Sequence, residues 1–454
     1  MTTRRDVLRG AGMMGGAGVM AGALPGFGAL AQTGGGYRAL VCVFLAGGMD
    51  GHDAVIPSDE AGHAEWTASR ESLVQAYAAL GDTSRERTEL LPLGQQADGR
   101  AFGMPRQMAG LHGAYEAGDL AVVGNVGPLV VPTTGADAKQ ERVPLPARLM
   151  SHNDQQSMWQ SLSPEGAVSG WGGRMRDLAA AASPFSAISV SSNPVFLAGK
   201  AQPFVLGTGG VHKVHATGTD WAYGSRDVPA AFEAHLTASA ASMDSLIASD
   251  LQASRRANLA AINDLAAMVE ASDAGDDVKV EQNKLSDQLA VVAKMIALRG
   301  QLGVSRQVFF VKMGGFDTHD GQAEKLPVLQ AKLSEAMASF HGWTERAGMA
   351  DMVTTFTASE FGRTLTANAT GTDHGWGGHH LVMGGAVDGG RIIGEVPPAV
   401  EGHAQDHGRG RMVPTTATVQ YAASLGRWFG LSASELLDVL PGLEEFDPAG
   451  ARLF

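Results

Sequence analysis

The chain has 454 residues, of which 44% are hydrophobic and 18% are charged, so it can bury a large core in one or two domains. Its 34 basic residues against 47 acidic ones give a formal charge of −13, which argues against a nucleic-acid-binding surface. The single cysteine, Cys42, excludes an intramolecular disulfide and a cysteine-based metal site. We expect Cys42 to be a buried strand residue.

Residues 1–31 predict an export signal. Arg4 and Arg5 precede a mildly apolar segment rich in glycine and alanine, and residues 29–31 form an A-x-A cleavage pattern. The segment resembles a twin-arginine signal peptide, and its glycines and Pro25 argue against a membrane-spanning helix. No later segment approaches about 18 uninterrupted apolar residues. We therefore expect a mature chain without a membrane segment, in the periplasm or secreted.

The first half of the mature chain alternates strand and helix patterns. An apolar run at residues 37–46 predicts a strand that ends in the glycines before Asp50. The following predictions are helix and surface loop over 59–100, a helix over 105–118, a buried strand over 120–126, a helix over 151–159, and short strands within 186–207.

The second half continues this alternation after an Ala/Leu-rich stretch with helical spacing. We expect a helical insertion at about 229–302, strands at 308–311, 352–357 and 381–384, and helices over 327–348, 414–429 and 432–440. The order predicts one α/β domain over 37–454. Its core would be a doubly wound, mainly parallel sheet with helices on both faces.

The stretch VFFVKMGGFDTHDGQ places Asp317 and His319 directly after a predicted strand. In open α/β sheets, ligands bind outside the carboxyl ends of the strands, and an aspartate and a histidine two residues apart can face one cation there. The alternative is that Asp317 caps a following helix and that His319 is a solvated loop residue.

Three more loops carry acid or histidine side chains after an apolar or glycine-rich run: Asp50, Glu360, and Asp373 with His374. Oxygen and imidazole ligands without sulfur suit zinc, manganese or a similar divalent ion. Each also has a structural alternative. Asp50 can serve a turn, Glu360 can pair with Arg363 on a first helical turn, and the Asp373 loop can be a polar turn. His379 and His380, which follow His374, are weaker candidates.

The sequence SHND at residues 151–154 has two interpretations. Ser151 as N-cap with Asp154 three residues later fits a capping box. A serine at a helix N-terminus is also a position where a nucleophile and an anion meet exposed N–H groups. Ser151 and His152 are therefore the candidate catalytic pair, with His152 as general acid/base, as a metal ligand, or in neither role.

The motifs LAGGMDG, SHNDQQSMW, GGFDTHDGQ, SEFGRT and GTDHGWGGHH, together with the leader, resemble the bacterial family named domain of unknown function 1501. That family is similar in fold to the alkaline phosphatase and sulfatase superfamily. The resemblance implies an alkaline-phosphatase-like core with metals at the carboxyl edge of the sheet. It also implies hydrolysis or transfer of phosphate or sulfate esters.

The resemblance carries over onto four residues. Asp50 matches the acidic ligand after the first strand, Asp317 the aspartate of the second metal motif, Glu360 the aspartate of an Asp-His pair, and His374 a late histidine ligand.

The chain also departs from the superfamily pattern. Gly321 stands where the second motif has histidine, so His319 must substitute, and Phe361 replaces the histidine after Glu360. Cys42 precedes Val-Phe-Leu, so the motif of a formylglycine sulfatase is absent.

Two hypotheses follow. The first is an exported metal-dependent hydrolase that acts on a small-molecule or polymer-borne ester, with divalent ions held by Asp50, Asp317, His319, Glu360 and the Asp373–His374 pair. Two cations roughly 4 Å apart would then hold the attacking and leaving oxygens. The second is a non-catalytic binding or assembly protein of the cell envelope, with the same fold and a protein partner.

Overall fold

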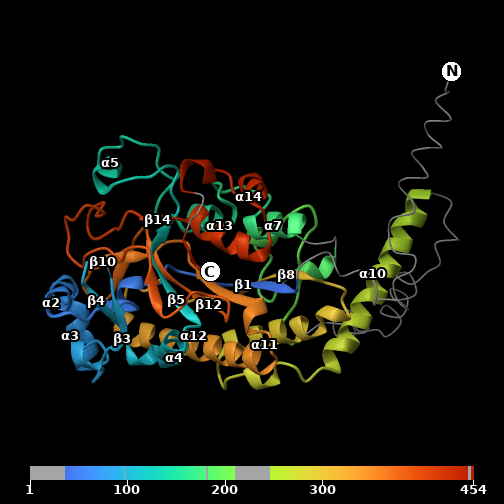
Figure 1. Cartoon of the computed structure of the whole chain (residues 1–454), viewed down its shortest axis with the longest axis horizontal. Helices are drawn as coiled ribbons and strands as arrows, with labels where there is room; N and C mark the ends of the chain where they lie inside the picture. Colours follow the sequence, from blue (N-terminus) through green and yellow to red (C-terminus); the bar gives the residue numbers. More distant parts are fainter. Residues whose placement is uncertain (1–35, 97, 180–182, 210–245, 448–450) are drawn as a thin grey trace, which may run out of the picture.

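The computed structural model describes residues 36–96, 98–179, 183–209, 246–447 and 451–454. The predicted signal peptide at 1–31 and the start of the predicted insertion, up to residue 245, lie outside these ranges. The described residues form an α/β fold, in which helices cover a central, mostly parallel sheet (Figure 1).

The central sheet is mixed but mainly parallel, as the sequence predicts. Strand β1 pairs in parallel with β8 on one side and β9 on the other, while β12 runs antiparallel to both of its neighbours. The spatial order is β13 (Arg391–Ile393), β5 (Leu120–Gly127), β12 (Gly378–Met383), β9 (Val353–Ala358), β1 (Arg38–Leu45), β8 (Arg306–Met313), β6 (Ala187–Ser189) and β7 (Phe204–Val205), with β14 (Thr416–Ala417) also paired to β5.

Strand β1 shows why this sheet needs cover on both faces. Its side chains alternate between two core clusters: Val41 and Val43 pack into one, and Leu40, Cys42 and Phe44 into the other. The continuous apolar run is therefore that of a central strand buried on both sides. Cys42 is 2% exposed, which confirms the prediction for this residue.

Helices supply the cover on each face (Figure 1). One face packs against α4 (Ala109–Glu116), α11 (Lys284–Ala297) and α12 (Gln322–Arg346), and the other against α7 (Trp171–Ala179), α13 (Thr418–Phe429) and α14 (Ala433–Val439). Helix α12 begins five residues before the predicted boundary at Pro327, which lies inside the helix. Pro327 is the sixth residue of the helix and has no N–H group, so it cannot donate to the Ala323 carbonyl oxygen four residues before it.

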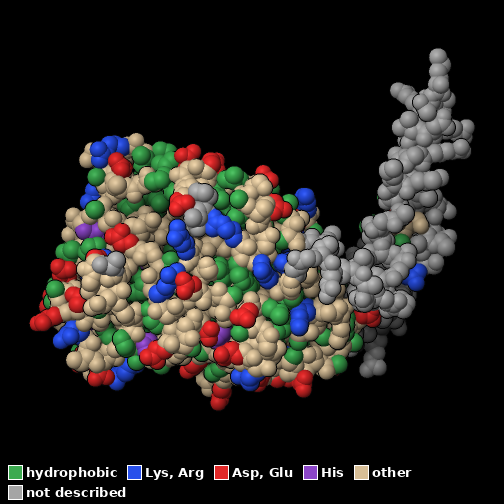
Figure 2. All heavy atoms as spheres, viewed as in Figure 1, with side chains coloured by type: hydrophobic (Ala, Val, Ile, Leu, Met, Phe, Trp, Pro, Cys, Tyr) green, Lys and Arg blue, Asp and Glu red, His purple; other side chains and the backbone are tan. Residues whose placement is uncertain are grey.

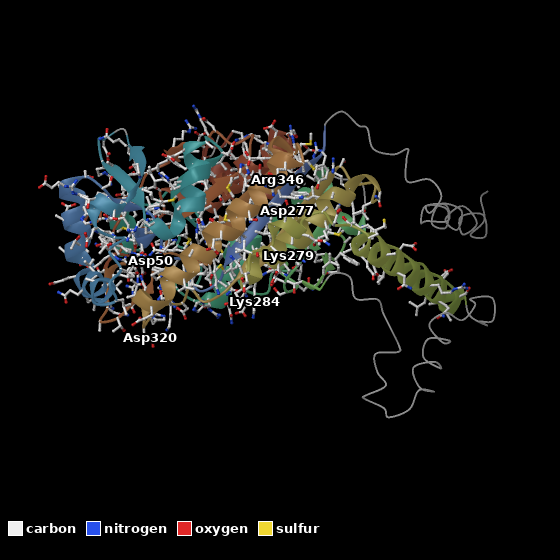
Figure 3. The ribbon with its side chains drawn as sticks, turned by 90° about the horizontal axis from the view of Figure 1, so that it is seen from below. Asp50, Asp277, Lys279, Lys284, Asp320 and Arg346 are labelled. Carbon is white, nitrogen blue, oxygen red and sulfur yellow. The ribbon has the colours of Figure 1, made fainter. Side chains whose placement is uncertain are left out.

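The described part of the predicted insertion consists mainly of α10 (Leu246–Glu270) and α11. Helix α11 lies beside α12 against the sheet, whereas α10 extends away from the body of the protein (Figure 3). The last turns of α10 reach the core, through Leu265 and Val269. Near its start, Ile247 is 82% exposed.

The remaining elements surround one end of the sheet. A three-stranded sheet consists of β2 (Ile56–Pro57), β4 (Ala101–Met104) and β3 (Leu91–Gln95), of which β3 lies in the region 59–100 that was expected to hold only helix and loop. A second pair consists of β10 (Arg363–Ala367) and β11 (Thr372–His374). The other helices are α2 (Glu60–Ser69), α3 (Glu71–Ala79), α5 (Gly135–Lys139) and α6 (His152–Ser161).

Single turns of 3-10 helix connect several of these elements. They span Gly51–Asp53, Arg87–Glu89, Arg106–Met108, Pro184–Ser186, Val195–Leu197, Asp276–Val278, Leu298–Gly300, Ala350–Met352 and Leu443–Glu445.

The surface carries both signs of charge. On the face shown in Figure 2, lysine and arginine side chains are scattered among aspartate and glutamate. Within the described ranges, the structure contains no helix with the length and apolar character that crossing a membrane requires.

Glycines let the loops at the carboxyl ends of the strands pack backbone against backbone. A Cβ atom on Gly47, after β1, would lie 2.3 Å from the Asp317 backbone nitrogen. A Cβ on Gly371 would lie 2.2 Å from the Thr318 carbonyl oxygen. These contacts are closer than side chains permit, so the glycines bring the loop of Asp317 into contact with two others.

We predict that Gly371→Ala destabilises the fold by about 1–3 kcal/mol, because the added methyl forces the two loops apart. Gly113→Ala is the matched control, since a Cβ at this position in α4 meets nothing within 4 Å. Alanine is also favoured over glycine in a helix. Urea unfolding measures the free energy of unfolding of each variant. Equal free energies of unfolding for Gly371→Ala and Gly113→Ala would contradict the packing argument.

Candidate metal centre

The candidate centre lies at the carboxyl edge of three adjacent strands, β8, β1 and β9. The loops after these strands carry Asp317, Asp50 and Glu360 respectively. Strand β11 brings His374 to the same edge, and His152 enters as the first residue of α6. The sequence prediction that distant loops meet here is therefore confirmed for these elements, although their side chains differ in what they contact.

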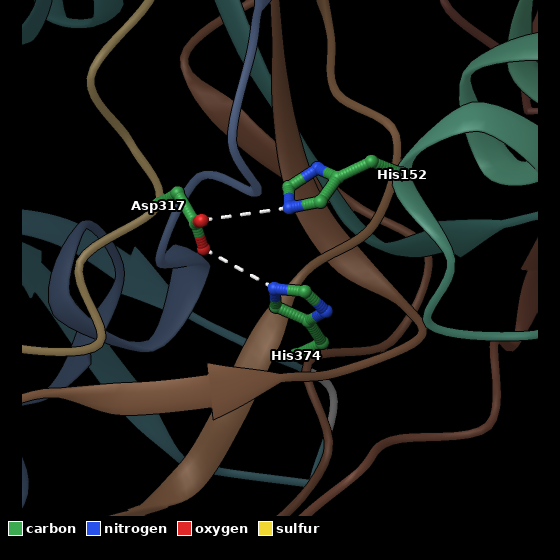
Figure 4. A group of neighbouring side chains, drawn as sticks. All are labelled: His152, Asp317 and His374. Carbon is green, nitrogen blue, oxygen red and sulfur yellow. Dashed lines mark hydrogen bonds and ion pairs between the residues drawn. The ribbon is translucent and has the colours of Figure 1, made fainter.

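Three imidazoles converge on the carboxylate of Asp317, and Figure 4 shows two of them, those of His152 and His374. His319 Nε2 lies 3.1 Å from Asp317 Oδ1, and His374 Nε2 lies 3.2 Å from the same oxygen. His152 Nε2 faces the other oxygen, Oδ2, at 3.5 Å. His152, Asp317 and His374 each offer a ligand atom within 4.8 Å of the other two.

Each imidazole is oriented by a partner on its other nitrogen. His152 Nδ1 lies 2.9 Å from Glu360 Oε1, and His374 Nδ1 lies 2.8 Å from the Met150 carbonyl oxygen. His319 Nδ1 lies 3.4 Å from an oxygen of Asp373. Carboxylate and carbonyl oxygens only accept hydrogen bonds, so these partners support the Nδ1–H tautomer, which a histidine adopts when its Nε2 lone pair binds a metal.

Lone pairs that face one another need a positive charge between them. His319 Nε2 and His374 Nε2 are 2.9 Å apart, and both point at an anionic oxygen. One proton can relieve one such contact, whereas a cation relieves all of them at once. Three imidazole nitrogens and one carboxylate, without sulfur, form a donor set suited to zinc or manganese. The residues therefore fit a divalent ion.

Glu360 is fully buried and holds other groups in place. Its Oε1 accepts hydrogen bonds from the Gly47 backbone N–H at 2.9 Å and from Gln156 Nε2 at 3.2 Å, besides its contact with His152. The carboxylate thus ties the β1 loop, the β9 loop and α6 together. We interpret Glu360 as the residue that orients His152.

Asp373 has the corresponding position beside His319. Its Oδ2 lies 3.3 Å from Arg409 Nη2, and its Oδ1 accepts a hydrogen bond from Asn368 at 3.4 Å. Asp373 and Glu360 therefore contact the imidazoles on the side away from Asp317.

Asp50 is buried and paired with an arginine. Its Oδ2 contacts Arg70 in an ion pair and accepts a hydrogen bond from Gln322 Nε2 at 2.7 Å. Its Oδ1 is also buried and has no hydrogen-bond partner among the described residues. Asp50 is thus at the predicted edge, but its charge is already balanced by Arg70.

A chain of hydrogen bonds connects Asp50 to Asp317. Gln322 Oε1 accepts a bond from Thr372 Oγ1 at 2.8 Å, and Thr372 Oγ1 accepts one from Arg363 Nε at 3.2 Å. Arg363 Nη1 then lies 2.8 Å from Asp317 Oδ1. The proposed pairing of Arg363 with Glu360 on a helical turn is wrong, because β10 begins at Arg363 and turns its side chain toward Asp317.

The ionisation of the centre follows from these contacts. Partial burial would raise the pKa of Asp317, but the hydrogen bond and charge of Arg363 outweigh it and hold that pKa below its ordinary value. Desolvation lowers the pKa of His374. A carboxylate that stays ionised and an imidazole that stays neutral are the forms that bind metal.

Ser151 is the N-cap of α6, as predicted, but its side chain does not accept a backbone N–H. Its hydroxyl instead donates to Asp154 Oδ2 at 2.9 Å. No hydrogen bond joins this hydroxyl to the imidazoles in the described part of the chain. Phe361, which stands where the superfamily has a histidine, packs its ring 4.9 Å from that of His152 and 4.3 Å from that of His374.

His379 and His380 lie in the core beside the centre. His379 Nδ1 accepts the Asn125 backbone N–H at 3.0 Å, and His380 Nδ1 lies 3.2 Å from the Thr357 hydroxyl. Burial lowers the pKa of His379 to about 4, and burial together with the neighbouring His379 lowers that of His380 to about 3. Both rings are therefore neutral core side chains.

Sequence reasoning did not identify the Met150 carbonyl, Gln322 and Gln156 as parts of the site. A backbone oxygen leaves no side-chain signature, and the two glutamines lie on helices among other polar residues. Positive φ angles at Arg148 and Met150 are the local feature that turns this carbonyl toward His374, and they are visible only in the structure.

We predict that His380→Gln reduces the loss of stability in mild acid. The unfolded chain binds a proton at this histidine near pH 6.5, whereas the folded chain binds it near pH 3. The stabilisation is therefore complete above pH 6.5 and is lost as the pH falls toward 3, by up to about 1.4 kcal/mol per pH unit. Urea unfolding at pH 7, 6 and 5 measures the slope, and an equal slope in the wild type and the variant would contradict the prediction.

Comparison with known proteins gives one family. A search of curated proteins finds no match to the chain. A family model described as "Protein of unknown function (DUF1501)" matches residues 37–439, a range that includes every residue of the candidate centre. Since this match spans most of the 454 residues, the chain belongs to the DUF1501 family.

Proposed function

We propose that this protein is an exported, metal-dependent hydrolase of phosphate or sulfate esters with an alkaline-phosphatase-like core. The observation that carries the proposal is the convergence of three oriented imidazoles on the ionised carboxylate of Asp317. Imidazole lone pairs aimed at a carboxylate are costly without a cation and favourable with one. The predicted twin-arginine leader supports export of the folded chain to the periplasm or beyond.

The charges around the centre support an anionic substrate. Although the whole chain is acidic, three arginines lie beside the cluster. Arg409 pairs with Asp373, Arg411 donates to the His374 carbonyl oxygen at 3.1 Å, and Arg148 lies 3.6 Å from Asp154 at the start of α6. Arg148 and Arg409 are largely exposed, so their charges can attract an ester anion toward the edge of the sheet.

The contacts suggest separate tasks for the histidines. Asp317 Oδ1, His319 Nε2 and His374 Nε2 form a compact triangle with sides of 2.9–3.2 Å, and we assign these three groups to the ion. A bound divalent ion would supply Lewis acidity, polarising the ester oxygen and acidifying a water molecule.

His152 faces the other side of Asp317. Its ring is oriented by the buried Glu360, and the side chain remains 35% exposed. An imidazole held by a carboxylate and open to solvent can take or give a proton at Nε2, so we assign His152 to general acid/base catalysis. Ser151 is less suited to act as nucleophile, since its hydroxyl is bonded to Asp154.

One observation favours the second candidate function, a non-catalytic envelope protein that binds or assembles with a partner. Arg70 neutralises Asp50, so a second cation at that position would have to compete with an arginine. A protein with a single ion and no turnover would then use the centre for binding or for stability. Metal content and turnover, measured together, separate the two functions.

We predict that the purified protein binds at least one divalent ion and that Asp317→Ala abolishes this binding, because the substitution removes the carboxylate to which the imidazoles point. Asp320→Ala is the matched control, since Asp320 lies three residues away with its side chain 81% exposed and paired to Lys325 (Figure 3). Elemental analysis measures the metal, and aryl phosphate and aryl sulfate hydrolysis measures activity. A metal-free, inert wild-type protein would overturn the proposal.

We further predict that His152→Asn keeps the metal but lowers kcat by about 10²–10⁴-fold, the usual contribution of a general acid/base. Loss of the ion in this variant would instead make His152 a ligand. Glu360→Gln should lower activity by about 10–100-fold through misorientation of the His152 ring and should keep the metal.

A further inference from the structure

A polar cavity lies beside the candidate centre, between α6 and the carboxyl end of β8. Its volume is about 310 Å³, at the lower end of the range for small-molecule sites. Both walls continue into the centre: α6 begins with His152, and the loop after β8 carries Asp317. The cavity therefore borders the place where the proposed ester would be cleaved.

The α6 wall is a stripe of amide and hydroxyl groups. Asn153, Gln156, Ser157 and Gln160 share one face of the helix and line the cavity. Gln156 uses its amide nitrogen to bond Glu360, and Gln160 uses its amide oxygen to accept the Phe196 backbone N–H at 3.2 Å. An acceptor on Gln156 and a donor on Gln160 thus remain without partners among the described residues.

The opposite side of the cavity adds a polar side chain and charged side chains of both signs. Asn193, Lys312 and Glu165 line it, and neither Lys312 nor Glu165 forms a side-chain ion pair with any described residue. Lys312 is half-buried, so its uncompensated charge is unusual for a purely structural lysine. Phe44 and Phe310 also line the cavity, but both side chains are only 1% exposed and belong to the core, so the accessible lining is mainly polar.

We propose that this cavity is a subsite for a sugar-type, polyhydroxylated group, which forms the alcohol part of the ester in the proposed reaction. Hydroxyl groups both donate and accept hydrogen bonds, as carboxamides do, so a sugar complements the remaining acceptor of Gln156 and the remaining donor of Gln160. The volume fits one ring rather than a polymer segment. The role of the sugar as the alcohol part of a cleaved ester rests on the proposed function. Binding of the sugar in the cavity does not require turnover.

Gln156 connects the subsite to the centre. The same side chain lines the cavity and donates to Glu360, the carboxylate that orients His152. A sugar that bonds Gln156 would therefore act one hydrogen bond away from the group that holds the proposed acid/base. This makes Gln156 a positioning residue.

The test is saturation-transfer NMR of the full mature chain with glucose, galactose, mannose, N-acetylglucosamine and glucuronic acid. We expect at least one of these sugars to bind. The signal should fall at least fivefold in Asn153→Leu/Lys312→Gln and in Asn193→Leu, which alter different walls. The control, Asn263→Leu/Lys284→Gln, changes the same residue types at exposed positions on α10 and α11 and should keep the signal (Figure 3).

Hydrolysis gives a second readout. In the cavity variants, the ratio of kcat/KM for the phosphate ester of the bound sugar to that for an aryl phosphate should fall about tenfold. Absence of sugar binding in the wild type, or equal binding in wild type and cavity variants, overturns the subsite even if aryl esters are cleaved. Sugar binding by a protein that lacks metal and turnover overturns the proposed function and leaves the subsite standing.

Discussion

The structure of this site depends on the electrostatic balance around one carboxylate. Asp317 receives three imidazole nitrogens on its outer side and the Arg363 guanidinium from within the protein. Arg363 is buried and keeps the carboxylate ionised, which makes Asp317 an anion before any ligand arrives. In the Nδ1–H tautomer that metal binding requires, the imidazoles direct lone pairs rather than protons at that charge. A permanent anion surrounded by lone pairs is the condition that attracts a cation.

This balance requires loops to approach one another more closely than side chains allow. Gly47 and Gly371 let the backbones of the β1 loop and the β11 hairpin contact the segment around Asp317. The hydrogen-bonded series from Asp50 through Gln322 and Thr372 to Arg363 then holds these loops together on their buried side. The glycines in these motifs therefore allow close packing between loops, besides forming turns.

Sequence reasoning predicted the fold class and the edge of the sheet where the site lies, because apolar runs and the glycines after them are local features. It identified Asp317, His319 and His374, which do converge. It assigned Asp50 and Glu360 as metal ligands, and it could not foresee that they contact Arg70 and His152, which come from distant segments. The antiparallel direction of β12 and the strand β3 within 59–100 were also missed, since the sequence of a strand carries no information about its pairing partner.

The groups that face Asp317 come from the start of α6, the loop after β8 and the β11 hairpin, which are far apart in the chain. An unfolded polypeptide therefore has no preformed centre, and cation binding is thermodynamically linked to completion of the central sheet. On the proposed export route, which carries folded proteins, the ion would be chosen where the chain folds. The metal supply of the cytoplasm, rather than that of the destination, would then decide which element the mature protein carries.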